Sequence, residues 1–301
     1  MKVAIAVCGP LRSFSNCYPT WLTHLITPLE KKIGEGNVKI FIDYFHTPED
    51  TYQNTHDKNI FTTKLEIDTA GWNDIINQSK YIQYKNRYNY DDSYIENIFN
   101  LINKTEDTNV TFNLYELKKY NKQKYIPKGH KYKKQRSIQK KQVYKSYYNF
   151  IQGICHIYNT KKIIDVIPSE YDYTIKIRAD AYLLKPYPID TILTMNSDSI
   201  YIQKEAKQQN NTGGSRFDTF YMAKTDVLKK IYTNIFKHFK TFCQKFIVCE
   251  KNWHTCKPEN LFCHIIYKSK IKVKPYPYIY EHNNWKVNRN LINFKYRYKQ
   301  Y

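Results

Sequence analysis

The chain has 301 residues, of which 42% are hydrophobic and 16% aromatic. These proportions exclude general disorder, and the length is sufficient to bury a sizeable core. Lys and Arg outnumber Asp and Glu by 48 to 27, so the formal net charge is +21. This charge favours an anionic partner such as nucleic acid, a phospholipid surface or a phosphorylated ligand, but the heavy use of Lys, Asn, Ile and Tyr is also typical of A/T-rich genomes.

Neither a membrane span nor a disulfide framework is indicated. The longest apolar runs, such as Val3 to Cys8, are too short to cross a bilayer, and no signal-peptide pattern follows Met1, so we expect a cytoplasmic protein. Seven cysteines form no Cys-x-x-Cys pair. The late cysteines, with His254 and His264, have spacings of five to six residues that do not match zinc knuckles.

The first 45 residues predict a strand, helix, strand unit of the parallel type. Lys2 to Cys8 is a short apolar run closed by Gly9-Pro10. Tyr18 to Ile33 carries apolar residues at three- and four-residue spacing, and Val38 to Phe45 predicts a second strand.

The pattern weakens from His46 to about Lys133 and becomes strong again afterwards. In the weak region we expect loops, a short helix near Trp72 to Ile76, and one or two strands in the apolar runs Tyr81 to Tyr84 and Val110 to Tyr115. The longest helix is predicted from Ser137 to about Val166. Its start lies in a dense basic run, which faces either solvent or an anion.

Strands and helices then alternate to the C-terminus. The strands are predicted at Tyr173 to Ile177, Ser199 to Gln203, Phe217 to Met222 and, less regularly, Lys270 to Tyr280, and the helices at Thr225 to Phe242 and Pro258 to Tyr267. This alternation predicts an α/β fold in which flanking helices cover a mostly parallel central sheet. No internal boundary is visible, so residues 1–301 are expected to form a single domain.

Polar residues stand where three of the predicted strands end or begin. They are Gly9, Arg12 and Ser13, then Arg178 and Asp180, then Arg216 and Asp218. Ligands of open α/β sheets bind at strand ends, so these residues are the candidates for chemistry. The chain has no Walker loop, Gly-x-Ser-x-Gly or His-Glu-x-x-His, which argues against a P-loop NTPase, an α/β-hydrolase and a zincin.

Each of these candidates also has a purely structural interpretation. Asp180 is an oxygen ligand suited to Mg²⁺ or Mn²⁺, or it caps a turn and pairs with Arg178. Arg12 and Ser13 are donors suited to a diphosphate, or they belong to a loop that leads into a helix.

Four short motifs together resemble a known family. GPLRSF at residues 9–14, YDYTIKIRADAYL at 171–183, RFDTFYMAKTD at 216–226 and PENLF at 258–262 are similar, in this order, to glycosyltransferase-like proteins of large DNA viruses and microbes. The resemblance is to the lipopolysaccharide-biosynthesis proteins of the WavE type, which show Gly-x-x-Arg near the N-terminus and Arg-x-Asp after a Tyr-Asp strand. Residues 46–130 carry no recognisable motif.

The resemblance implies a GT-A-like, Rossmann-like fold that binds a nucleotide-diphosphate sugar. In that fold an Asp-x-Asp after a central strand holds a metal ion and the donor diphosphate, which implies Mn²⁺ or Mg²⁺ as cofactor. Asp180 matches the second Asp, whereas Arg178 occupies the first position. A guanidinium cannot bind a cation, so Arg178 neutralises the diphosphate directly in this interpretation, with Gly9, Arg12, Ser13 and Lys145 as further donor-binding candidates.

The later motifs supply catalytic candidates. Asp218 and Glu259 are candidates for the base that activates an acceptor hydroxyl, or for acceptor binding. As alternatives, Asp218 is a turn residue after Gly213-Gly214, and Glu259 interacts with the dipole of a helix start. His282 is a candidate second metal ligand beside Asp180.

The sequence therefore favours a glycosyltransferase, with a nucleotide-sugar donor and a glycan, polysaccharide or protein acceptor. A viral member would work in the host cytoplasm or the virion. Two alternatives remain open. One is a nucleic-acid-binding protein, which the charge and 30 tyrosines would suit, and the other is an inactive transferase fold retained as an interaction protein.

Overall fold

The computed structural model describes a large part of the chain. The described residues are 1–11, 14–45, 69–104, 153–179, 181–183, 186–202, 220–239, 258–275 and 285–287. Within these ranges, no helix combines the length and the apolar character that a membrane crossing needs.

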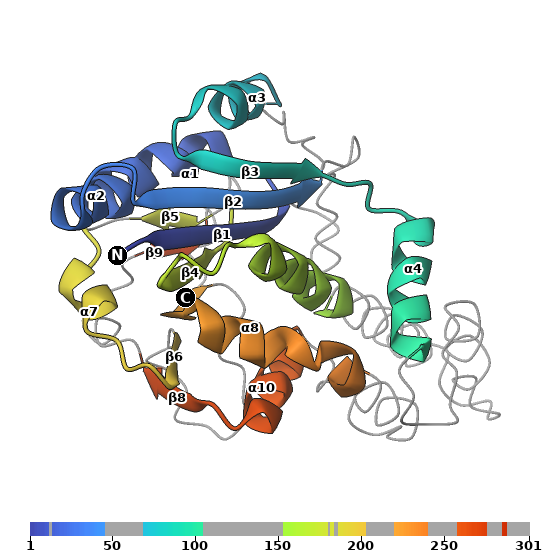
Figure 1. The fold of residues 1–301 in the computed structure, drawn as a ribbon. Helices are drawn as coiled ribbons and strands as arrows, with labels where there is room; N and C mark the ends of the chain where they lie inside the picture. The colour runs from blue at the N-terminus through green and yellow to red at the C-terminus, as the bar shows by residue number, and fades with distance from the viewer. Residues whose placement is uncertain are drawn as a thin grey trace, which may run out of the picture.

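A seven-stranded sheet forms the centre of the molecule (Figure 1). Its strands, in spatial order, are β3 (Ile82–Arg87), β2 (Val38–Phe45), β1 (Val3–Pro10), β4 (Tyr173–Ile177), β7 (Phe220–Lys224), β6 (Ser199–Ile202) and β8 (Lys272–Pro275). Strands β3, β2, β1 and β4 are mutually parallel, and β8 is parallel to β6. Strand β7 is antiparallel to both of its neighbours. The predicted α/β fold with a mostly parallel sheet is thus confirmed.

Helices cover both faces of the sheet (Figure 1). One face packs against α1 (Phe14–Trp21), the π-helix η1 (Leu22–Ile26), α2 (Thr27–Ile33) and α3 (Thr69–Gln78). The other face packs against α4 (Asp92–Asn103), a helix over residues 153–166, α8 (Thr225–Thr233) and α10 (Pro258–Ser269). Because successive side chains of a strand point to opposite faces, β1 contributes Val3, Ile5 and Val7 to the first core. It contributes Ala4, Ala6 and Cys8 to the second.

A small second sheet lies next to the central one. It pairs β5 (Ala181–Leu183) with β9 (Trp285–Val287) in antiparallel fashion. Between β5 and β6 the chain forms the short helix α7 (Ile189–Leu193).

The predicted strands agree with the structure best at the centre of the sheet. The bounds of β2 and β4 are as predicted, and β1, β6 and β8 lie within or close to their predicted runs. The predicted helix Tyr18 to Ile33 begins earlier, at Phe14, and contains the π-helical turn after Pro19, a residue that cannot donate a backbone hydrogen bond. The run Val110 to Tyr115 and residues 137–152 of the longest predicted helix lie outside the described residues.

The end of α10 is conformationally strained. Lys270, directly after the helix, has φ +56°, in the left-handed region, and its backbone N–H donates to the carbonyl of Tyr267 at 3.3 Å. Side chains with a Cβ are disfavoured in this conformation, and glycine is the usual residue there.

We therefore predict that Lys270→Gly increases the free energy of unfolding by about 0.5–1 kcal/mol, because relief of the left-handed strain outweighs the greater chain entropy of glycine. Urea unfolding followed by circular dichroism measures the effect. As a control, Lys268→Gly within the helix should lower stability by about 1 kcal/mol. A loss of stability in Lys270→Gly would contradict the prediction.

Candidate functional site

The order of the strands creates a switch point between β1 and β4. From β1 the chain builds the sheet in one direction through β2 and β3, and then returns to place β4 on the other side of β1. Strands β1 and β4 end at the same edge of the sheet, and the segments that follow them, α1 and β5, pack together on one face of it. In open α/β sheets, ligands bind in the crevice outside the carboxyl ends of the strands at such a point.

Gly9 and Arg178 lie at this edge. The last paired residues of β1 and β4 are Val7 and Ile177, and the two candidates follow them within two residues. Gly9 has φ +106°, a conformation that favours glycine, so a side chain there would strain the backbone. Arg178 is partly exposed and carries the charge at the end of β4.

Helix α1 holds the segment that follows Arg178. The indole Nε1 of Trp21 donates to the carbonyl of Ala181 at 2.6 Å, and the backbone N–H of Leu183 donates to Oγ1 of Thr20 at 3.0 Å. Trp21 and Ala181 are both buried. The backbone on the far side of position 180 is thus anchored to the first helix of the chain.

A row of polar side chains crosses the sheet beneath this edge. Asp43 of β2, Cys8 of β1 and Lys176 of β4 lie on the same face of three adjacent strands, and we call them the polar row. All three are buried, and Lys176 has no exposed surface. The helix over residues 153–166 covers them and supplies their partners.

Each member of the polar row contacts that helix. The Nζ of Lys176 lies 3.2 Å from Nε2 of His156 and 5.8 Å from the centroid of the Tyr221 ring. The Sγ of Cys8 lies 3.2 Å from Oγ1 of Thr160. The helix contact of Asp43 is an ion pair with Lys162, at 3.3 Å.

Asp43 is the most deeply placed carboxylate of the described sheet edge. Its residue is 1% exposed, and it accepts a hydrogen bond from the Asn86 side chain at 2.5 Å. Burial raises the pKa of Asp43 above its ordinary value, against the opposing effects of the Asn86 hydrogen bond and the Lys162 ammonium. Lys162 also lies over the rings of Tyr88 and Tyr94, at 5.0 and 5.7 Å from their centroids.

Three basic side chains stand near this edge among the described residues. Lys162, which is 31% exposed, pairs with Asp43, Lys176 is buried against His156, and the partly exposed Arg178 directly follows β4. A guanidinium presents a planar fork of donors suited to phosphate oxygens. Arg178 is therefore a candidate phosphate ligand at this edge.

The structure brings together two of the predicted site residues, Gly9 and Arg178. Glu259 lies in the first turn of α10, but its side chain is not among those described. The other predicted site residues lie outside the described residues; they are Arg12, Ser13, Lys145, Asp180, Asp218 and His282. Within the described part of the chain, no three His, Cys, Asp or Glu side chains are grouped as a metal site would require.

The polar row was missed by the sequence interpretation. Asp43 and Lys176 are charged residues inside the otherwise apolar strands VKIFIDYF and YTIKI. This interruption of an apolar run was the feature of the sequence that could have indicated the polar row. All five residues of β4 are buried, although Tyr173, Ile175 and Ile177 alternate with Thr174 and Lys176, because the strand is central and helices cover both faces of the sheet.

Comparisons with known proteins add no relative. A scan against protein-family models gives no match, and a search of curated protein sequences finds no significant similarity.

We predict that Trp21→Phe destabilises the protein by about 1–3 kcal/mol, because the buried carbonyl of Ala181 loses its donor while most of the ring packing is kept. Urea unfolding measures the loss. Phe14→Leu changes packing in the same core without removing a hydrogen bond, and it is the control for the part of the loss that comes from packing. Equal stability of Trp21→Phe and wild type would show that the hydrogen bond does not hold this segment.

A second prediction concerns pH. Because the pKa of Asp43 is higher in the folded than in the unfolded state, folding is favoured below the ordinary carboxyl pKa of 3.8, and this contribution is lost as the pH rises through the folded pKa. In Asp43→Asn that loss should disappear. The stability of the variant relative to wild type should thus increase from pH 3 to about pH 7, as urea unfolding at each pH would show. Parallel pH profiles would contradict the prediction, and Asp74→Asn on the exposed side of α3 is the control.

Proposed function

We propose that this chain is a glycosyltransferase that moves a sugar from a nucleotide-diphosphate donor to a glycan, polysaccharide or protein acceptor. One observation carries the proposal. The switch point of a mostly parallel sheet, where ligands of such sheets bind, lies between Gly9 and Arg178, and Arg178 places a guanidinium there. These residues belong to two of the motifs on which the resemblance rests, and a GT-A-like fold is compatible with the sheet.

In this proposal Gly9 and Arg178 bind the donor diphosphate. A residue without a side chain at position 9 lets the backbone approach a phosphate closely. The Arg178 guanidinium presents a planar fork of donors to phosphate oxygens. Breaking the bond between sugar and diphosphate puts negative charge on the leaving group, and the Arg178 guanidinium stabilises it.

Activation of the acceptor hydroxyl, and the remaining contacts to the donor, are assigned to residues that the structure does not describe in full. A carboxylate that takes the proton of the acceptor hydroxyl is required if the reaction inverts the anomeric centre, and Asp218 and Glu259 remain the proposed bases. Arg12, Ser13 and Lys145 remain proposed as further contacts to the donor. Asp180 follows Arg178 by two residues and is proposed to bind the donor directly or through a cation.

The family resemblance also implies a metal ion. Asp180 and His282 would hold Mn²⁺ or Mg²⁺, which supplies positive charge to a leaving diphosphate when bound. Carboxylate and imidazole groups can bind such an ion, but Arg178 stands at the position where the first carboxylate of the motif is expected. In this proposal Arg178 supplies charge of the same sign to the diphosphate.

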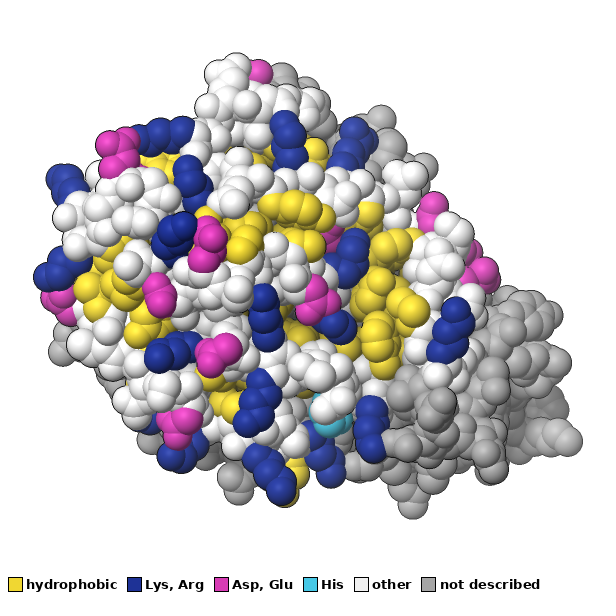
Figure 2. Space-filling view, viewed as in Figure 1, with side chains coloured by type: hydrophobic (Ala, Val, Ile, Leu, Met, Phe, Trp, Pro, Cys, Tyr) yellow, Lys and Arg dark blue, Asp and Glu magenta, His cyan; other side chains and the backbone are white. Residues whose placement is uncertain are grey.

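The alternative of nucleic-acid binding receives less support. Figure 2 shows Lys and Arg side chains scattered over the viewed face among acidic ones, and not gathered into one continuous stripe. A polyanion is bound by an exposed and continuous basic surface.

The test is a panel of UDP-, GDP- and CMP-sugars in a thermal-shift assay, with and without Mn²⁺. A donor at 100 times its Kd should stabilise the protein by about 2.7 kcal/mol and raise the melting temperature by several degrees. Arg178→Gln should weaken donor binding by about ten- to a hundredfold, the loss expected for a charge-assisted hydrogen bond, and Arg178→Lys should recover only part of it. Asp180→Ala should abolish binding or turnover.

Asp74→Ala, an exposed aspartate on α3, is the matched control and should bind as wild type does. If no nucleotide-sugar shifts the melting temperature while DNA or RNA binds with a steep salt dependence, the chain is a nucleic-acid-binding protein and the proposal is wrong. If a donor binds without any turnover across a panel of acceptors, the inactive transferase fold is favoured.

A further inference from the structure

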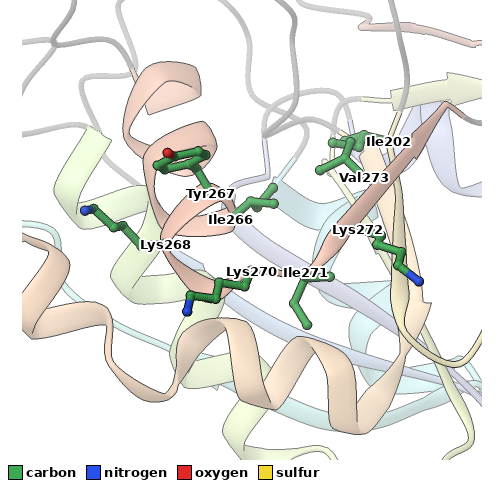
Figure 3. Close-up of a pocket in the computed structure, with 8 residues that line it drawn as sticks. All are labelled: Ile202, Ile266, Tyr267, Lys268, Lys270, Ile271, Lys272 and Val273. Carbon is green, nitrogen blue, oxygen red and sulfur yellow. The ribbon is translucent and has the colours of Figure 1, made fainter.

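A groove lies at the opposite end of the sheet from β3, between the end of α10 and the edge strand β8 (Figure 3). Its volume is about 600 Å³, which falls within the range of small-molecule sites. The floor is apolar and consists of Ile202, Ile266 and Ile271. The turn at residues 270–271 joins the helix to the strand and closes one end of the groove (Figure 3).

Two walls of the groove are apolar side chains left in contact with solvent. Tyr267 of α10 is 79% exposed, and Val273 of β8 is 50% exposed. In the described part of the chain only four large hydrophobic side chains are exposed, and the other two are Met1 and Val166. Exposed apolar side chains that gather around a concave surface mark a ligand or partner site, unlike those scattered singly.

Lysines surround this apolar groove. Lys268, Lys270 and Lys272 line it together with the residues above, and in Figure 3 their ammonium groups point outward around the apolar side chains. Lys272 forms an ion pair with Asp198 at 2.6 Å. Lysines on an edge strand also prevent unwanted strand pairing, which explains Lys272 but not Lys268 and Lys270, which lie on the helix and the turn.

We propose that this groove binds an amphiphile with a single apolar chain and an anionic head, such as a lipid phosphate. The chain would lie on the isoleucine floor between Tyr267 and Val273, where its burial displaces water from apolar surface. The head would meet the ammonium groups of Lys268 and Lys270, which favour an anion. This inference does not depend on the proposed transferase activity, because the groove and the switch point share no residue.

The probe is decyl phosphate below its critical micelle concentration, added to the full chain in a titration calorimeter. Decanol tests the apolar chain alone, and inorganic phosphate tests the head alone. We expect decyl phosphate to bind at least about tenfold more tightly than either, because both parts of the groove contribute.

Three variants locate the site. Lys268→Gln with Lys270→Asn removes two charges and keeps a residue that tolerates the left-handed conformation at position 270, and should weaken decyl phosphate by about tenfold. Val273→Glu should weaken it further, because a carboxylate in the groove repels the phosphate. Lys31→Gln with Lys104→Gln removes the same charge from α2 and the end of α4, and should leave the affinity unchanged. Circular dichroism of each variant verifies that it is folded.

Three results would overturn the proposal. The first is that decyl phosphate binds no more tightly than phosphate, and the second is that the control double variant loses the same affinity, since either would show nonspecific attraction to a basic protein. The third is that an alternating Val-Glu peptide binds at this groove and decyl phosphate does not. That result would show strand addition to β8 by an acidic segment.

Discussion

The parallel pairing of β1 with β4 is the contact on which the rest of the architecture depends. It joins the strand–helix–strand unit of the first 45 residues to the second half of the sheet, and it gives both strands neighbours on either side. Their side chains then enter two cores at once, one on each face. The same pairing creates the switch point, so the interaction that stabilises the fold also forms the candidate site.

The polar row shows how this edge differs from an ordinary core. A buried carboxylate loses hydration, and the Asn86 side chain and the Lys162 ammonium compensate in part for Asp43. An apolar residue at this position would avoid that cost. A buried carboxylate whose pKa is raised, at the end of a strand, is a feature often found at functional sites.

The local sequence pattern was sufficient to predict the central strands, but it was not sufficient to predict several of the other elements. Strands β2 and β4 consist mostly of β-branched and aromatic residues, and their bounds follow from this local composition. Helix α4 was not predicted, although Ile95, Ile98, Phe99 and Ile102 pack on the core, because many polar residues obscure this spacing. The strands β5 and β9 have three residues each and exist through pairing between distant segments, which no local pattern records. Gly9 and Arg178 directly follow predicted strands, so their position at strand ends could be predicted. The burial of Asp43 and Lys176 could not, because it depends on the helix over residues 153–166 that covers both strands.

The pairing of β1 with β4 also has a consequence for how the protein is made. Its partners are 170 residues apart in the sequence, as Val3 and Tyr173 show. During synthesis the first strand can pair with β2 early, but its other edge stays open until more than half of the chain has been translated. Contacts of such long range slow folding, and open strand edges promote association between chains in the meantime. Chains that are still being translated therefore expose an unpaired, apolar strand edge. A chaperone that binds extended apolar segments would recognise such an edge.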